Sequence, residues 1–66
     1  MIKYLIKDIR KTEGMSQKDL ARYSGVSESK ISAIERNKRD PTIPVACQLA
    51  KALHVEIKAL FENVEE

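Results

Sequence analysis

The sequence predicts an all-α protein, a compact domain of five short helices joined by tight turns. Its 66 residues are enough for one domain, and at that size a single hydrophobic core is only just sufficient. Ala, Leu, Ile, Lys and Glu recur at helical spacing, whereas strand-forming residues do not cluster in alternating runs. Residues that cap or break helices divide the chain into short segments. We therefore treat residues 1–66 as a single domain.

The first helix is predicted over residues 2–12. Its inner face is expected to carry three isoleucines at helical spacing, Ile2, Ile6 and Ile9. Its outer face carries three lysines, Lys3, Lys7 and Lys11. Gly14 follows and is typical of a helix C-terminus, so the chain should turn there.

A sharp corner is predicted between a second and a third helix. Ser16 caps the second, over residues 17–23, and Ser27 caps the third. Gly25 occupies the corner, because glycine accepts positive φ. The small and apolar residues that two steeply crossed helices need follow in register: Leu20, Ala21, Val26, Ile31 and Ile34. This spacing is typical of a DNA-reading helix-turn-helix, whose second helix projects into a major groove about 12 Å wide.

The remaining chain predicts a loop and two more helices. Residues 36–41 form the loop, since Asn37 tolerates a left-handed conformation and Pro41 stops a helix. Thr42 caps the fourth helix, and Pro44 falls in its first turn, where a missing N–H costs nothing. Its inner face should carry Val45, Leu49, Ala50 and Leu53. A short fifth helix, near residues 57–61, should close the core with Val55, Leu60 and Phe61.

Composition narrows the classes of function. No apolar run approaches the roughly 20 residues of a membrane span, and the first residues do not resemble a signal peptide, so we expect a cytoplasmic protein. Cys47 is the one cysteine, and no Cys/His cluster could hold a metal. Residues 1–40 hold ten Lys and Arg against six Asp and Glu, whereas residues 41–66 hold two against four. That asymmetry is compatible with a polyanionic partner and equally with an ordinary mixed surface.

Across residues 4–61 the sequence closely resembles the Cro/lambda-repressor-like (XRE) helix-turn-helix regulators. The matching pattern is S16-Q17-x-x-L20-A21-x-x-S24-G25-V26-S27-x-x-x-I31-S32-x-I34-E35, then P41-T42 and L49-A50-K51-A52-L53. The resemblance implies a compact five-helix lambda-repressor-like domain. Asn37 and His54 stand where that family usually has glycine, and both tolerate positive φ better than most residues.

The resemblance also implies a role for each matching residue. Gln17 would bind a phosphate while leaning on the recognition helix at residues 27–36. The base-facing and groove-edge positions would be Ser27, Glu28, Ser29, Lys30, Ser32 and Ala33. The following loop would grip the DNA backbone with its amides and side chains, at Asn37, Lys38 and Arg39. Arg10 and Glu35 match positions that form a partly buried ion pair. Glu28 leaves two interpretations open, a hydrogen bond from a cytosine amino group or stabilisation of the helix N-terminus.

The predicted function is a sequence-specific transcriptional regulator, a repressor that binds a pseudo-palindromic operator in double-stranded DNA as a homodimer. The alternative is an antitoxin-like or adaptor module whose main ligand is a protein. Apolar residues near the chain end are expected to form the dimer seam, although Leu60 and Phe61 could instead close the core: Ile57, Leu60, Phe61 and Val64. The sequence carries no catalytic or phosphate-loop motif, so we exclude an enzyme and expect no cofactor and no small-molecule ligand.

Overall fold

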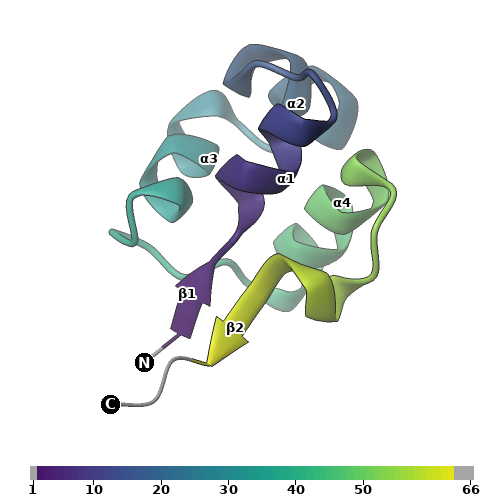
Figure 1. Ribbon diagram of the computed structural model, residues 1–66. Coiled ribbons are helices and arrows are strands. Elements are labelled where there is room, and N and C mark those ends of the chain that lie inside the picture. Colours follow the sequence, from purple (N-terminus) through teal and green to yellow (C-terminus); the bar gives the residue numbers. More distant parts are fainter. Residues whose placement is uncertain (1, 64–66) are drawn as a thin grey trace.

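The computed structural model describes residues 2–63. The elements follow in the order β1 (Ile2–Tyr4), α1 (Ile6–Thr12), α2 (Gln17–Ser24), α3 (Glu28–Glu35), α4 (Ile43–Leu53), the 3-10 helix η1 (Ile57–Leu60) and β2 (Phe61–Asn63). Figure 1 shows the helices gathered around one centre, with the two strands side by side at one end of the molecule. The mostly helical class is therefore confirmed. None of the helices in the described part of the chain is long and apolar enough to cross a membrane.

The core draws on every helix. Helix α2 packs against both α3 and α4, and η1 packs on α4. The fully buried apolar side chains come from α1, α2, α3, α4, η1 and the corner before α3: Ile6, Leu20, Val26, Ile31, Ile34, Leu49, Ala50, Leu53 and Leu60. Helical spacing in the sequence places most of these on inner faces, so the core is the best-predicted part of the fold.

The predicted start of the first helix at Ile2 is wrong. Helix α1 begins at Ile6, and residues 2–4 instead pair antiparallel with residues 61–63. In this register Lys3 faces Glu62 and Tyr4 faces Phe61. A pair of opposite charges and a pair of aromatic rings are both favourable cross-strand neighbours. The backbone N–H of Leu5 extends the contact by donating to the carbonyl of Leu60 at 2.7 Å.

The fifth α-helix is not confirmed. Its place is taken by η1, a single 3-10 turn, after which the backbone of Phe61 is extended, with φ −148° and ψ 159°. Leu60 is 1% exposed and closes the core, whereas Phe61 is 40% exposed and does not. Because Phe61 opens a strand that pairs with β1, its side chain leaves the core that Leu60 enters.

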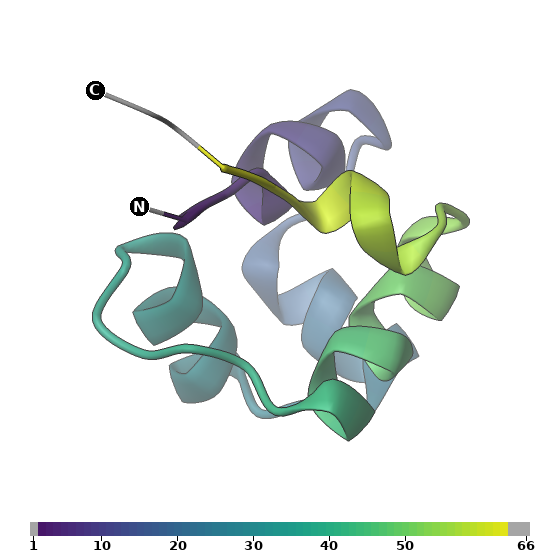
Figure 2. The same cartoon turned by 90° about the horizontal axis from the view of Figure 1, so that it is seen from below.

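The segment between α3 and α4 has no regular structure, and Figure 2 shows it running along one edge of the helix bundle. It is fastened to the terminal sheet by the hydroxyl of Tyr4, which donates a hydrogen bond to Asp40 Oδ1 at 2.9 Å. Partial desolvation and this bond to a carboxylate raise the pKa of Tyr4. The terminal sheet therefore steadies the loop that follows α3.

Candidate nucleic-acid interface

Helix α2 starts with a complete capping box. The Ser16 hydroxyl accepts a hydrogen bond from the backbone N–H of Asp19 at 3.0 Å, and the backbone N–H of Ser16 donates to the Asp19 carboxylate at 3.1 Å. The bond from the Ser16 backbone is the largest cause of the lowered pKa of Asp19. Two of the otherwise unpaired N–H groups at the helix start are satisfied in this way. Ser16 thus fixes where Gln17 enters α2.

The corner between α2 and α3 is built by three consecutive residues. Gly25 has φ 77° and donates its N–H to the carbonyl of Ala21 at 3.0 Å. A Cβ at Gly25 would meet nothing within 4 Å, so the requirement for glycine is one of backbone conformation and not of space. The hydroxyl of Ser24, which is buried, accepts from the N–H of Val26 at 3.1 Å. Val26 is itself buried and anchors the turn to the core.

Helix α3 has one face in the core and one face outside. Ser27 accepts a hydrogen bond from the N–H of Lys30 and caps the helix, as predicted. Ile31 and Ile34 are buried. The predicted base-facing residues lie on the other side, where four are exposed and two are half-buried: Ser27, Glu28, Ser29 and Lys30, then Ser32 and Ala33. The exposed face of α3 therefore offers hydroxyls, a carboxylate and an ammonium group.

A polar hollow of about 380 Å³ lies where α2 meets the outer face of α3. It is lined by Gln17, Glu28, Ser29, Ser32 and Arg36, so four predicted site residues from two helices meet there. Arg36 was missed from the sequence. Its Nε donates to the carbonyl of Ser32 at 3.3 Å, which keeps the guanidinium beside the hollow. Its position four residues after Ser32 was the available signal, because such residues share a helix face.

The expected Arg10–Glu35 ion pair is present and is bidentate. Arg10 Nε donates to Glu35 Oε2 at 2.8 Å, and Nη2 donates to Oε1 at 3.0 Å. The remaining guanidinium nitrogen, Nη1, donates to the carbonyl of Met15 at 2.8 Å. Hydrogen bonding to Glu35 raises the pKa of Arg10 even though burial acts to lower it. The guanidinium therefore joins α1, the turn before α2 and the end of α3.

Glu35 also holds Gln17, a contact that the sequence did not reveal. Gln17 Nε2 donates to Glu35 Oε1 at 3.0 Å. Burial acts to raise the pKa of Glu35, but the hydrogen bonds from Arg10 and Gln17 and the nearby positive charges outweigh it, so the pKa is lowered. An amide group has two N–H donors, and this bond uses one of them. Gln17 is thus oriented by the same carboxylate that joins α1 to α3.

The loop after α3 begins with a Schellman motif. Asn37 has φ 57° and donates its N–H to Ile34, and the N–H of Lys38 donates to Ala33 at 2.9 Å. His54 ends α4 in the same way, with φ 59°. The positive φ expected at both positions is therefore confirmed. The expectation that the loop amides grip DNA is wrong for Asn37 and Lys38, because those two N–H groups already satisfy helix carbonyls. Their side chains and that of Arg39 are exposed.

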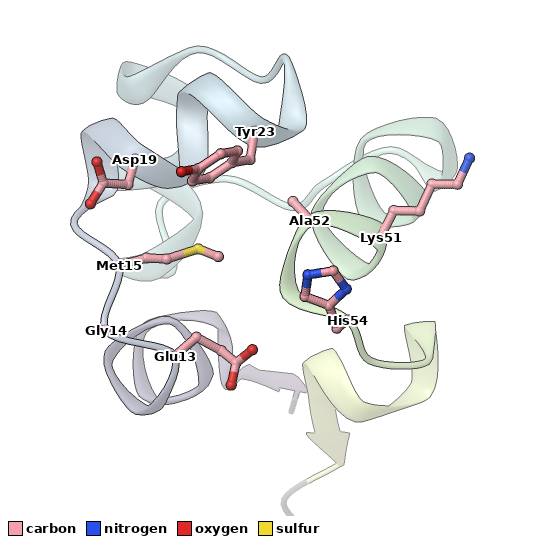
Figure 3. A pocket seen from close by; sticks show the side chains of 8 residues that line it. All are labelled: Glu13, Gly14, Met15, Asp19, Tyr23, Lys51, Ala52 and His54. Atoms are coloured by element: carbon pink, nitrogen blue, oxygen red, sulfur yellow. The ribbon is translucent and has the colours of Figure 1, made fainter.

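A larger hollow, of about 680 Å³, lies away from the exposed face of α3 (Figure 3). Its walls come from the turn after α1, from α2 and from the end of α4, and Tyr23 and His54 face it from opposite sides. Glu13 and Asp19 place negative charge on one wall. Carboxylates repel phosphates, so this surface is unsuited to nucleic acid. Among the described residues no buried polar side-chain atom lacks a hydrogen-bond partner.

Comparison with known proteins agrees with this geometry. The helix-turn-helix family profile matches residues 6–60. An uncharacterised HTH-type transcriptional regulator of Methanocaldococcus jannaschii is 38% identical over 60 residues, which cover 91% of each chain.

Two solved structures are similar as well. The restriction-modification controller protein C.AhdI from Aeromonas hydrophila has a TM-score of 0.78 and 32% identity, over 80% of each chain. The controller protein C.Esp1396I, solved as a tetramer with its natural 35 base-pair operator, has a TM-score of 0.74 and 44% identity, over 79% of this chain and 68% of that one. The chain belongs to the helix-turn-helix family.

Proposed function

We propose that the protein is a sequence-specific DNA-binding transcriptional regulator that acts as a homodimer. The observation that carries the proposal is the outer face of α3, which stands clear of the core while its N-terminus, its C-terminal loop and Gln17 surround it with polar and basic groups. The operator complex of the similar C.Esp1396I supports DNA as the ligand. A regulator of this kind acts by occupying a promoter, and we propose repression as the outcome.

The residues divide into two groups by the part of DNA that they contact. The side chains of Lys38 and Arg39 bind phosphates, and Gln17 uses its second N–H for another phosphate. Asn37 adds a side-chain contact to the backbone. Base edges are read by the residues of the outer face of α3, with Ser27 and Ala33 at the groove edge: Glu28, Ser29, Lys30 and Ser32.

Arg36 joins the reading group because it lines the same hollow as Glu28 and Ser32. An arginine presents donors in a planar fork that matches the O6 and N7 atoms of guanine. Glu28 carries the opposite preference, since its carboxylate can accept from a cytosine amino group. A neighbouring acceptor and donor favour an operator half-site that contains adjacent C and G.

Selection of bound fragments from random DNA tests the proposal directly. A recovered motif with two inverted halves about one helical turn apart, and a complex whose mass contains two protomers, are the expected results. The matched control is the variant with Ser29→Ala and Lys30→Ala, which leaves the core face of α3 untouched. Equal recovery of all sequences by the wild-type protein would contradict the proposal and would favour a protein ligand.

A further inference from the structure

One face of the molecule carries exposed apolar side chains that the DNA-binding function does not use. Four large hydrophobic residues in the described chain are exposed, and three of them line one groove of about 400 Å³: Ile2 at 43%, Ile43 at 77% and Phe61 at 40%. Tyr4, Pro41 and Ile57 line it as well. The fourth exposed residue, Tyr23 at 65%, lies elsewhere. A cluster of this kind on a small domain marks an interaction surface.

The shape of this groove suits a second copy of the same chain. A two-fold contact uses the same patch on both partners, so the patch must be complementary to itself. Here a projecting side chain, Ile43 in the first turn of α4, stands beside a hollow that is lined by apolar groups. Two-fold rotation would bring each projecting isoleucine to the other protomer's hollow.

Charge around the groove also permits like to meet like. Lys3 faces Glu62 across the two strands, and Lys58 Nζ lies 3.4 Å from Glu56 on η1. The carboxylate of Asp40 accepts from the Tyr4 hydroxyl. Because each sign is matched within one protomer, two copies would not repel one another at this face, although the chain has a net charge of +2.

The groove also lies beside the DNA-binding loop without covering α3. Pro41 follows that loop directly, and the segment from α3 to α4 runs along the edge of the bundle (Figure 2). A stable interface takes about 800 Å² from each partner. That is about a sixth of the 4668 Å² surface of the protomer, an area that the sheet, the loop and the start of α4 can supply together.

We propose that a second copy of this chain docks on the face formed by the terminal sheet and the start of α4, with Ile43 of each protomer in the groove of the other. The proposal rests on the proposed function, because it supplies the symmetry that an inverted-repeat operator needs. It also changes the expected seam. Ile57 and Phe61 remain in it, Leu60 is excluded as a core residue, and Val64 lies outside the described residues.

The first test is Ile43→Glu. Ile43 is the first residue of α4, where an acidic side chain favours the helix, so the variant should fold. Sedimentation equilibrium without DNA should find a wild-type dimer and a variant whose self-association is weaker by roughly thirtyfold, the effect of losing an interface hot spot. Gln48→Glu, at an exposed position of the same helix, is the control for charge and should leave the dimer unchanged. A wild-type monomer at all concentrations, or equal dimerisation of Ile43→Glu, would overturn the proposal.

The second test uses cross-linking and does not depend on weakening the dimer. In a Cys47→Ser background, which removes the exposed native thiol, Ile43→Cys and Phe61→Cys chains are prepared separately and mixed. We expect a mixed disulfide between them and none between Ile43→Cys and Tyr23→Cys. Cross-linking of both pairs at the same rate, or of neither, would contradict this dimer face. Binding of a single half-site by the Ile43→Glu monomer separates the outcomes, because sequence preference there would survive failure of the dimer proposal.

Discussion

Loss of the Glu35 carboxylate should be among the most damaging changes that this protein can undergo. Glu35→Ala would leave the guanidinium of Arg10, which is 7% exposed, without its bidentate partner and would also release Gln17. Removing one partner of a buried ion pair costs about 3–5 kcal/mol. A domain of 66 residues has about 3–10 kcal/mol of stability in total, at 0.05–0.15 kcal/mol per residue. The variant should therefore lose a large part of its free energy of unfolding.

Urea denaturation followed by circular dichroism measures this loss, and thermal melting provides a second reading. At about 4 °C or more per kcal/mol for a domain of this size, the melting temperature should fall by roughly 12 °C or more. The matched variant replaces both partners, Arg10→Met with Glu35→Leu, and should be more stable than Glu35→Ala because no buried charge is left uncompensated. A loss of less than about 1 kcal/mol in Glu35→Ala would refute the reasoning, since that is the value of an exposed pair.

Three further outcomes follow from the same structure. Gly25→Ala should cost about 1–2 kcal/mol in urea denaturation, because a side chain at φ 77° is strained even in open space, and an unchanged midpoint would contradict the left-handed corner. Lys38→Ala and Arg39→Ala should each weaken operator and scrambled DNA alike and lower the salt slope by about one, and a selective loss for the operator would show base reading instead. The lowered pKa of Glu35 contributes stability that is present above the ordinary glutamate pKa of about 4.3 and is lost as the pH falls through the lower folded value, so wild-type protein should lose more stability there than the double variant lacking both Arg10 and Glu35.

Local signals in the sequence predict most of the fold and of the site. Ser16, Gly25 and Ser27 act within a few residues of themselves, so their caps and corner follow from residue type and spacing. The same holds for the positive φ of Asn37 and His54. Helical periodicity likewise separates the core face of α3 from its exposed face.

Contacts between distant segments account for the errors. The terminal strands have three residues each and pair the two ends of the chain, so neither shows an alternating pattern long enough to see. The isoleucine spacing that suggested a helix from Ile2 is compatible with both structures at that length. The bond from Gln17 to Glu35 and the polar hollow beside Arg36 require the packed arrangement of α2 and α3, which spacing alone does not give.

The central claim is that α3 reads bases while the surrounding residues hold the backbone, and one measurement tests it most directly. Fluorescence anisotropy would give the affinities of wild type, Ser29→Ala, Lys30→Ala and Lys38→Ala for selected operator and for scrambled DNA at several salt concentrations. We predict that each α3 variant loses about 1–3 kcal/mol of discrimination per base contact, whereas Lys38→Ala keeps its discrimination and loses affinity for both DNAs. Full discrimination by both the Ser29 and Lys30 variants would contradict the claim.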